Sequence, residues 1–169
     1  ELRYQTGSGN LVGLRGQSVE SLVADIAFFK KGDFDMISVS PFIPHPQTPL
    51  ADESAGDLQM TLKMTALTRI VSRNAHIPAT TAIGSLRGRD ERSRALGVGA
   101  NVLMPNFTPA PYRQQYEIYP NKRCVAEEPG ACPNCMEHMV AALGRFVDRS
   151  KGHSLKPQSA AIPAAFRSN

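Results

Sequence analysis

The sequence contains no apolar run that approaches the ~20 residues that a helix needs to cross a membrane. It also lacks an initial basic stretch followed by an apolar one, so we expect neither a membrane span nor a signal peptide in it. No basic block interleaved with aromatic residues occurs. The formal net charge of +4 suits an anionic ligand but is too weak to indicate nucleic acid. We therefore expect a small-molecule substrate and neither a nucleic acid nor a membrane as a partner.

Cysteine is scarce, with three residues in the whole chain, Cys124, Cys132 and Cys135. An odd number clustered in one segment does not fit a secreted disulfide framework and indicates a metal or redox site in a reducing compartment. Cytoplasm is therefore the expected location. Three thiolates at this spacing can converge on one ion or cluster, with His138 as the nearest fourth ligand. A zinc site, an iron–sulfur cluster and idle cysteines all remain open at this point.

What the chain does contain is enough apolar sequence for one ordinary core, because 41% of its 169 residues are hydrophobic. Strand and helix patterns alternate along it, which predicts parallel strands joined by right-handed crossovers and hence an α/β fold. The predicted strands lie near 4–14 and at 35–40, 77–83 and 100–104. The predicted helices cover 18–31, 57–72, a short stretch through 95–97 and a last segment after the cysteines.

Three helical stripes are predicted to be buried, from apolar residues repeated three or four positions apart. In the first helix they are Val19, Leu22, Val23, Ile26 and Phe29. In the second they are Leu58, Leu62, Ala66 and Ile70, widened by Met64, Leu67 and Val71. In the last they are Met136, Met139, Val140, Leu143 and Phe146. Periodicity then stops, so we expect a flexible tail over 148–169.

Glycine is frequent in the first predicted strand, at Gly7, Gly9 and Gly13, but the dinucleotide fingerprint G-x-G-x-x-G is not met. These glycines either bring the backbone close to a flat ligand or allow tight packing of strand on helix. Thr80 and Thr81, at the end of the third predicted strand, offer donors to a carboxylate, although threonine is also simply a good strand residue. The sequence alone leaves both pairs of alternatives open.

Five segments then occur in a recognisable order: Thr6–Gln17 (TGSGNLVGLRGQ), Pro41–Ala51 (PFIPHPQTPLA), Ile77–Ala82 (IPATTA), Gly99–Asn106 (GANVLMPN) and Pro111–Gln114 (PYRQ). Together they resemble the carboxyl-terminal half of the HydE family, the radical S-adenosylmethionine maturases of iron-only hydrogenase. The similarity covers roughly residues 1–147 and extends more loosely to biotin synthase and methylornithine synthase.

The resemblance implies a (β/α)8 barrel whose amino-terminal half carries the CxxxCxxC loop for the 4Fe-4S cluster that cleaves S-adenosylmethionine. That loop is absent here, so we expect residues 1–104 to form a half barrel of strands five to eight, inactive alone. Residues 105–147 would form a loop, the cysteine site and a helix. The resemblance also implies a 5′-deoxyadenosyl radical that acts on a small sulfur-containing or iron–cysteine substrate in H-cluster assembly. The implied partners are the missing half and other maturation proteins.

The resemblance also implies roles for individual residues. The S-adenosylmethionine contacts would be Gly9, Leu11, Val12 and Gly13. The substrate contacts would be Thr80, Thr81, Ala82, Met104, Tyr116 and Tyr119. Cys124, Cys132 and Cys135 match an accessory iron–sulfur site found in part of the family, away from the radical chemistry.

Two alternatives stand beside this prediction. One is another radical S-adenosylmethionine synthase of the biotin or methylornithine type, against which the three cysteines argue. The other is a stand-alone metal-binding module that assists assembly without radical chemistry. An upstream CxxxCxxC in the encoding frame would favour the enzyme, and a start codon next to Glu1 would favour the module.

Overall fold

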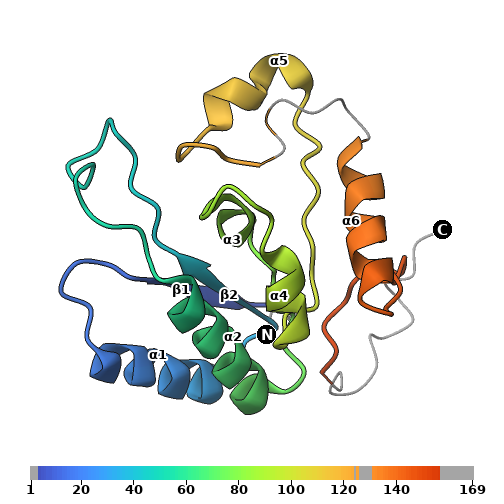
Figure 1. Cartoon of the computed structure of the whole chain (residues 1–169). Coiled ribbons are helices and arrows are strands. Elements are labelled where there is room, and N and C mark those ends of the chain that lie inside the picture. Colours follow the sequence, from blue (N-terminus) through green and yellow to red (C-terminus); the bar gives the residue numbers. More distant parts are fainter. Residues whose placement is uncertain (1–3, 124, 126–130, 157–169) are drawn as a thin grey trace.

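We analysed a computed structural model of the chain, which describes residues 4–123, 125 and 131–156 (Figure 1). Its first four elements follow the predicted alternation of strand and helix, and the later ones are helices. The elements are β1 (Gly7–Val12), α1 (Val19–Gly32), β2 (Met36–Pro41), α2 (Leu58–Ser72), α3 (Thr81–Ser85), α4 (Arg92–Gly97), α5 (Ala110–Arg113), the 3-10 helix η1 (Gln114–Tyr116) and α6 (Ala131–Ala142). No helix of the described residues is both long and apolar enough to span a bilayer.

The sheet is parallel, which confirms the predicted α/β class. β1 and β2 pair in register from Gly7 opposite Met36 to Val12 opposite Pro41, with α1 as the crossover between them. Beyond β2 the sheet continues only as two single parallel bridges, from Met36 to His76 and from Pro78 to Val102. The strand order in space therefore follows the order in sequence.

The third predicted strand, 77–83, is wrong beyond Ala79. The amide of Ala79 still donates to the carbonyl of Val102 at 2.9 Å, but the chain enters helix α3 at Thr81. Pro78 has no amide proton to give to a ladder, and the Thr80 hydroxyl accepts from the Ile83 amide at 3.4 Å as a helix cap. The fourth predicted strand, 100–104, is likewise reduced to the single bridge at Val102.

The two long helices begin and end close to their predicted bounds because their caps are explicit in the sequence. Ser18 accepts from the Ser21 amide at 3.2 Å at the start of α1. Asp57 accepts from the Met60 amide at 2.7 Å at the start of α2. A short polar side chain at this position satisfies an amide that has no partner inside the helix.

The buried faces of these helices differ from the predicted stripes. In α1, Leu22 and Phe29 are buried, whereas Val19 and Val23 are 61% and 62% exposed. In α2, Leu67 and Ile70 are exposed. A threonine face is buried instead, made of Thr61, Thr65 and Thr68. The Thr61 and Thr65 hydroxyls donate to carbonyls four residues earlier, so their methyl groups pack inward without an unpaired hydroxyl.

Two core clusters meet at α2. One joins the helix-covered face of β1 and β2 to α1 and α2, and its residues are Val12, Leu22, Phe29, Ile37, Val39, Met64 and Ala75. The other joins α2 to α3, α4 and α6, and its residues are Leu58, Leu62, Ile77, Ala79, Ile83, Ala95, Leu96, Ala100 and Val140. α1 and α2 thus cover a single face of the sheet.

α6 is shorter than its predicted stripe. Met136 and Val140 are buried, but the helix ends at Ala142, and Phe146 is 88% exposed. The part of the predicted flexible tail that the structure describes, 148–156, runs back to the amino ends of the strands. There the Ser154 hydroxyl donates to the Asp35 carboxylate. The His153 carbonyl oxygen lies 2.9 Å from His76 Nε2. Residues 157–169 lie outside the described residues.

Candidate functional site

One face of the sheet is left uncovered by the described residues, and the predicted S-adenosylmethionine contacts lie along it. Paired residues of parallel strands share a face, so Gly9 lies beside Ser38 and Leu11 beside Ser40. Leu11 is 43% exposed, and both serines are half-buried. This surface, which we call the inner face, combines one apolar side chain with hydroxyls. Val12 points the other way and is 1% exposed in the core.

Steric constraints explain two of the glycines. A Cβ built on Gly9 would lie 2.4 Å from the Ser38 carbonyl oxygen. Gly13 has a φ of +96°, and a Cβ there would lie 2.3 Å from the Cα of Gly56. Neither position accepts a side chain without backbone movement. The alternative of tight backbone packing therefore has direct structural support, while a ligand contact at these glycines stays a prediction.

The predicted substrate threonines lie at the first turn of α3, next to the end of β2. Thr80 is buried, and its hydroxyl is 3.2 Å from the Ser40 hydroxyl of the inner face. Thr81 is half-buried and Ala82 is buried. The structure thus brings Thr80 and the inner face together through one hydrogen bond.

The remaining predicted substrate contacts lie on the segment that follows the last bridge. Met104 and Tyr116 are exposed, at 48% and 57%. Tyr119 is half-buried, and burial raises the pKa of its phenol above the ordinary value of 10.0, while the Ser85 hydroxyl and the Arg92 charge oppose that rise in part. Of these three side chains, Tyr119 thus lies beside α3, through the Ser85 hydroxyl.

A polar cluster that the sequence analysis missed surrounds the end of α3. Arg92 is 3% exposed, and its guanidinium donates to both carboxylate oxygens of Asp90, at 3.0 Å from Nε to Oδ1 and 2.6 Å from Nη2 to Oδ2. Burial raises the pKa of Asp90, but the hydrogen bonds and charge of Arg92, with the charge of Arg123, leave it below its ordinary value of 3.8. The signal in the sequence was the run Arg87, Arg89, Arg92 and Arg94, a pattern that predicts a solvated surface of helix and loop.

The cysteine site is described only in part. Cys124 lies outside the described residues, and Cys132 lies on α6 with its side chain outside them. Cys135, three residues further along α6, is a free and exposed thiol, and His138 is exposed as well. Within the described part of the chain no three potential ligands come together. The accessory cluster therefore remains a prediction from the resemblance.

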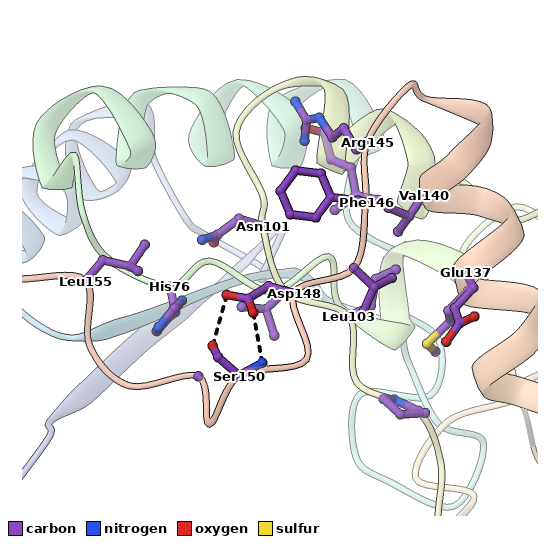
Figure 2. Close-up of a pocket in the computed structure, with 16 residues that line it drawn as sticks. His76, Asn101, Leu103, Glu137, Val140, Arg145, Phe146, Asp148, Ser150 and Leu155 are labelled. Atoms are coloured by element: carbon purple, nitrogen blue, oxygen red, sulfur yellow. Dashed lines mark hydrogen bonds between the residues drawn. The ribbon is translucent and has the colours of Figure 1, made fainter.

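A groove of about 470 Å3 lies at the other side of the last bridge, between 101–105, α6 and 145–155 (Figure 2). Its lining is mostly apolar, with Leu103 and Val140 among the residues on it. His76 and Asp148 add polar groups, and Asp148 accepts from the Ser150 amide at 2.8 Å and from its hydroxyl at 2.9 Å. None of the predicted site residues whose side chains the structure describes lines this groove.

Comparison with known proteins shows which proteins this chain is similar to. No protein-family model matches the chain. It is, however, similar to a maturase of [FeFe] hydrogenase. That relative is the HydE subunit of Thermotoga maritima, 53% identical over 154 residues, which are 90% of this chain and 43% of HydE. The predicted resemblance to HydE is thereby confirmed, and the chain spans less than half the length of this relative.

A second, weaker similarity is to 3-methylornithine synthase of Methanosarcina acetivorans. The identity is 31% over 103 residues, which are 61% of this chain and 28% of that protein. Both similarities agree with the prediction from the sequence, namely a resemblance to HydE and a looser one to methylornithine synthase.

Proposed function

We propose that this chain is the carboxyl-terminal half of a HydE-type radical S-adenosylmethionine enzyme that acts in hydrogenase maturation. The observation that carries the proposal is the 53% identity to HydE over 90% of the chain. In this proposal the chain supplies part of the barrel wall and the substrate contacts, and a preceding half supplies the cluster loop.

An open strand edge supports a half barrel. Among the described residues β1 pairs with β2 alone, and Val19 and Val23 of α1 stand exposed one turn apart on the adjoining helix. On the opposite side, the groove beside 101–105 is lined by α6 and 145–155 of this chain. A closed eight-stranded barrel has no strand edge such as the one at β1. A preceding half would pair with that edge.

The inner face is proposed to bind S-adenosylmethionine and the substrate. The 4Fe-4S cluster of the preceding half, when bound, supplies the electron that cleaves S-adenosylmethionine. Gly9 to Gly13 would carry the nucleoside along β1, with Leu11 as the exposed apolar contact. A flat apolar ring system suits a surface that offers an aliphatic side chain between small residues.

The substrate side of the proposed site is formed by α3 and the tyrosine-bearing segment. Thr80, Thr81 and Ala82 would hold the carboxylate of a small sulfur-containing substrate, and Met104, Tyr116 and Tyr119 would line the cavity around it. The chain's own part in the reaction is then to orient that substrate and to exclude water from it. The Tyr119 phenol is neutral at neutral pH, as an ordinary tyrosine is, and burial raises its pKa further, which suits a donor to an anion.

An accessory iron–sulfur cluster at Cys124, Cys132 and Cys135 is part of the proposal. Anaerobic iron, sulfide and zinc analysis of the reconstituted protein, beside the triple change of these residues to alanine, tests it. Iron and acid-labile sulfide that disappear in the triple variant are the expected result. Zinc in place of iron, or no difference between the proteins, would contradict the cluster and leave the barrel proposal untouched.

The similarity to 3-methylornithine synthase favours one second candidate, a radical S-adenosylmethionine synthase of the methylornithine type. The same inner face would serve it. The two candidates differ in the substrate held by α3. Incubation with an amino acid and, separately, with a cysteine-derived substrate, followed by product analysis, distinguishes them.

The proposal is tested by Leu11→Arg in the full-length protein that contains this chain, reconstituted without oxygen. Production of 5′-deoxyadenosine is expected to fall by at least about tenfold, because a charged side chain replaces the apolar contact on the inner face. Leu14→Arg is the matched control, since Leu14 is 37% exposed but lies outside β1. Equal activity of both folded variants would contradict the placement of S-adenosylmethionine on β1.

A further inference from the structure

The Arg123 side chain connects two parts of the proposed site that are far apart in sequence. We infer that Arg123 is a positioning residue that fixes the tyrosine-bearing segment 105–123 against α3. The use of this arrangement in substrate binding rests on the proposed function, whereas the contacts themselves do not.

Three donors of Arg123 are directed at α3 and the turn after it. Its Nε donates to the Gly84 carbonyl at 3.0 Å, its Nη2 to the Gly88 carbonyl at 2.6 Å, and its backbone amide to the Ser85 hydroxyl at 3.0 Å. A planar guanidinium can reach two carbonyls at once, whereas a lysine ammonium acts as a single point charge. The segment is therefore attached by a fork that only arginine supplies.

Ser85 carries this attachment to both predicted sets of substrate residues. It is 7% exposed, and its hydroxyl donates to the Thr81 carbonyl at 2.9 Å while it accepts from Arg123. The same hydroxyl lies beside the Tyr119 phenol. Release of Arg123 would thus loosen Tyr119 from the helix that begins with the proposed substrate threonines.

The surroundings of Arg123 favour a positive charge at this place. Asp90, already paired with buried Arg92, lies close enough for the Arg123 charge to act on it. One carboxylate therefore faces two guanidinium groups. The Gly84 and Gly88 carbonyl dipoles add further negative potential at the Arg123 side chain, so the attachment does not depend on one ion pair alone.

The segment that Arg123 holds has internal order of its own. Arg113 is 3% exposed, and its Nε donates to the Thr108 carbonyl at 2.7 Å. Lys122 donates to the Tyr116 carbonyl at 2.6 Å. Because these contacts lie within 105–123, Arg123 acts on a segment that is already folded. Its loss is expected to detach the segment rather than to unfold it.

The test compares Arg123→Met and Arg123→Lys with the parent in the full-length protein that contains this chain. Arg149→Met is the matched control, because Arg149 is 76% exposed and pairs with Glu137 on α6. Hydrogen exchange of peptides from 105–123 is expected to speed up by at least about tenfold in Arg123→Met, since several hydrogen bonds to a charged group are lost together. Arg123→Lys is expected to lie between parent and Arg123→Met.

A spectroscopic readout separates positioning from general stability. In the parent, a late-ionising tyrosinate signal that disappears in Tyr119→Phe belongs to Tyr119. In Arg123→Met that signal is expected to move to lower pH, because the phenol becomes hydrated.

Unchanged exchange together with an unchanged Tyr119 signal in folded Arg123→Met would overturn the inference. If Arg123→Met does not fold, the same two measurements on Arg123→Lys decide in the same way. Neither measurement uses S-adenosylmethionine or iron, so a failure of the proposed radical chemistry would appear separately.

Discussion

At the scale of single residues, Gly9 in β1 and Gly13 just after it are constrained by close backbone contacts. Gly9 and Gly13 both lie where a Cβ would meet main-chain atoms of a neighbouring segment. The sequence showed the cluster of glycines but not its cause, because the close partners, Ser38 and Gly56, are far along the chain. Ligand binding at the same backbone is compatible with this and is a separate claim.

Gly9→Ala is expected to destabilise the fold by about 1–3 kcal/mol, because the added methyl group would press on the Ser38 carbonyl oxygen. Urea unfolding of the variant and the parent measures the difference. Gly97→Ala is the control, since no heavy atom lies within 4 Å of a Cβ there. Equal unfolding midpoints for the parent and Gly9→Ala would show that the strands separate without cost.

Asp90→Asn is expected to cost about 3 kcal/mol near neutral pH, because it removes the Asp90 charge from beside the buried Arg92 guanidinium. The folded-state pKa of Asp90 is lowered, so its contribution is complete above its unfolded pKa of about 4 and is lost as pH falls through the folded value. Unfolding free energies at neutral pH and below pH about 3 measure this.

Glu137→Gln is the matched control for that pair, since the Glu137 and Arg149 side chains are 42% and 76% exposed and such a pair contributes at most about 1 kcal/mol. A difference between parent and Asp90→Asn that stays constant down to acid pH would contradict the assigned role of the Asp90 carboxylate.

At the scale of elements, the sequence predicted where α1 and α2 lie but not which side of them is buried. Their bounds follow from local caps, Ser18 and Asp57, which act within one turn. Their faces depend on neighbours. Hydrophobicity alone placed Leu67 and Ile70 on the buried face, whereas both are exposed, and Thr65 is buried with its hydroxyl satisfied within the helix.

The predicted strand 77–83 likewise depends on more than local sequence, and the structure has only one bridge there. Its residues have strand propensity, but Pro78 interrupts the ladder and Thr80 caps a helix. The contacts of Arg123 with α3 span 38 and 39 residues for Ser85 and Gly84, so no local pattern could have predicted them. The candidate site was therefore found in the sequence only by resemblance.

Removal of everything after Val147 is expected to loosen the amino ends of the strands. The Ser154 hydroxyl donates to Asp35, and the Lys156 ammonium lies 2.9 Å from Asp33, so the truncation leaves both carboxylates without these partners. Hydrogen exchange of peptides covering 33–37 and 74–78 is expected to accelerate. Unchanged exchange there would mean that 148–156 rests on the fold without stabilising it.

At the scale of the whole molecule, the described fold is a parallel α/β unit with one covered face and one open inner face. Among the described residues β1 leaves one strand edge open, and α6 and 145–155 line the opposite side beside 101–105. The proposed half barrel accounts for the open edge and the open inner face, since a second half would pair with β1 and enclose that face.

The most direct test of this account joins the portion of Thermotoga maritima HydE that precedes the aligned region to this chain. The account predicts that the chimera, with its 4Fe-4S cluster reconstituted and reduced, converts S-adenosylmethionine to 5′-deoxyadenosine, whereas this chain alone does not. A folded chimera that holds its cluster and forms no 5′-deoxyadenosine would contradict it.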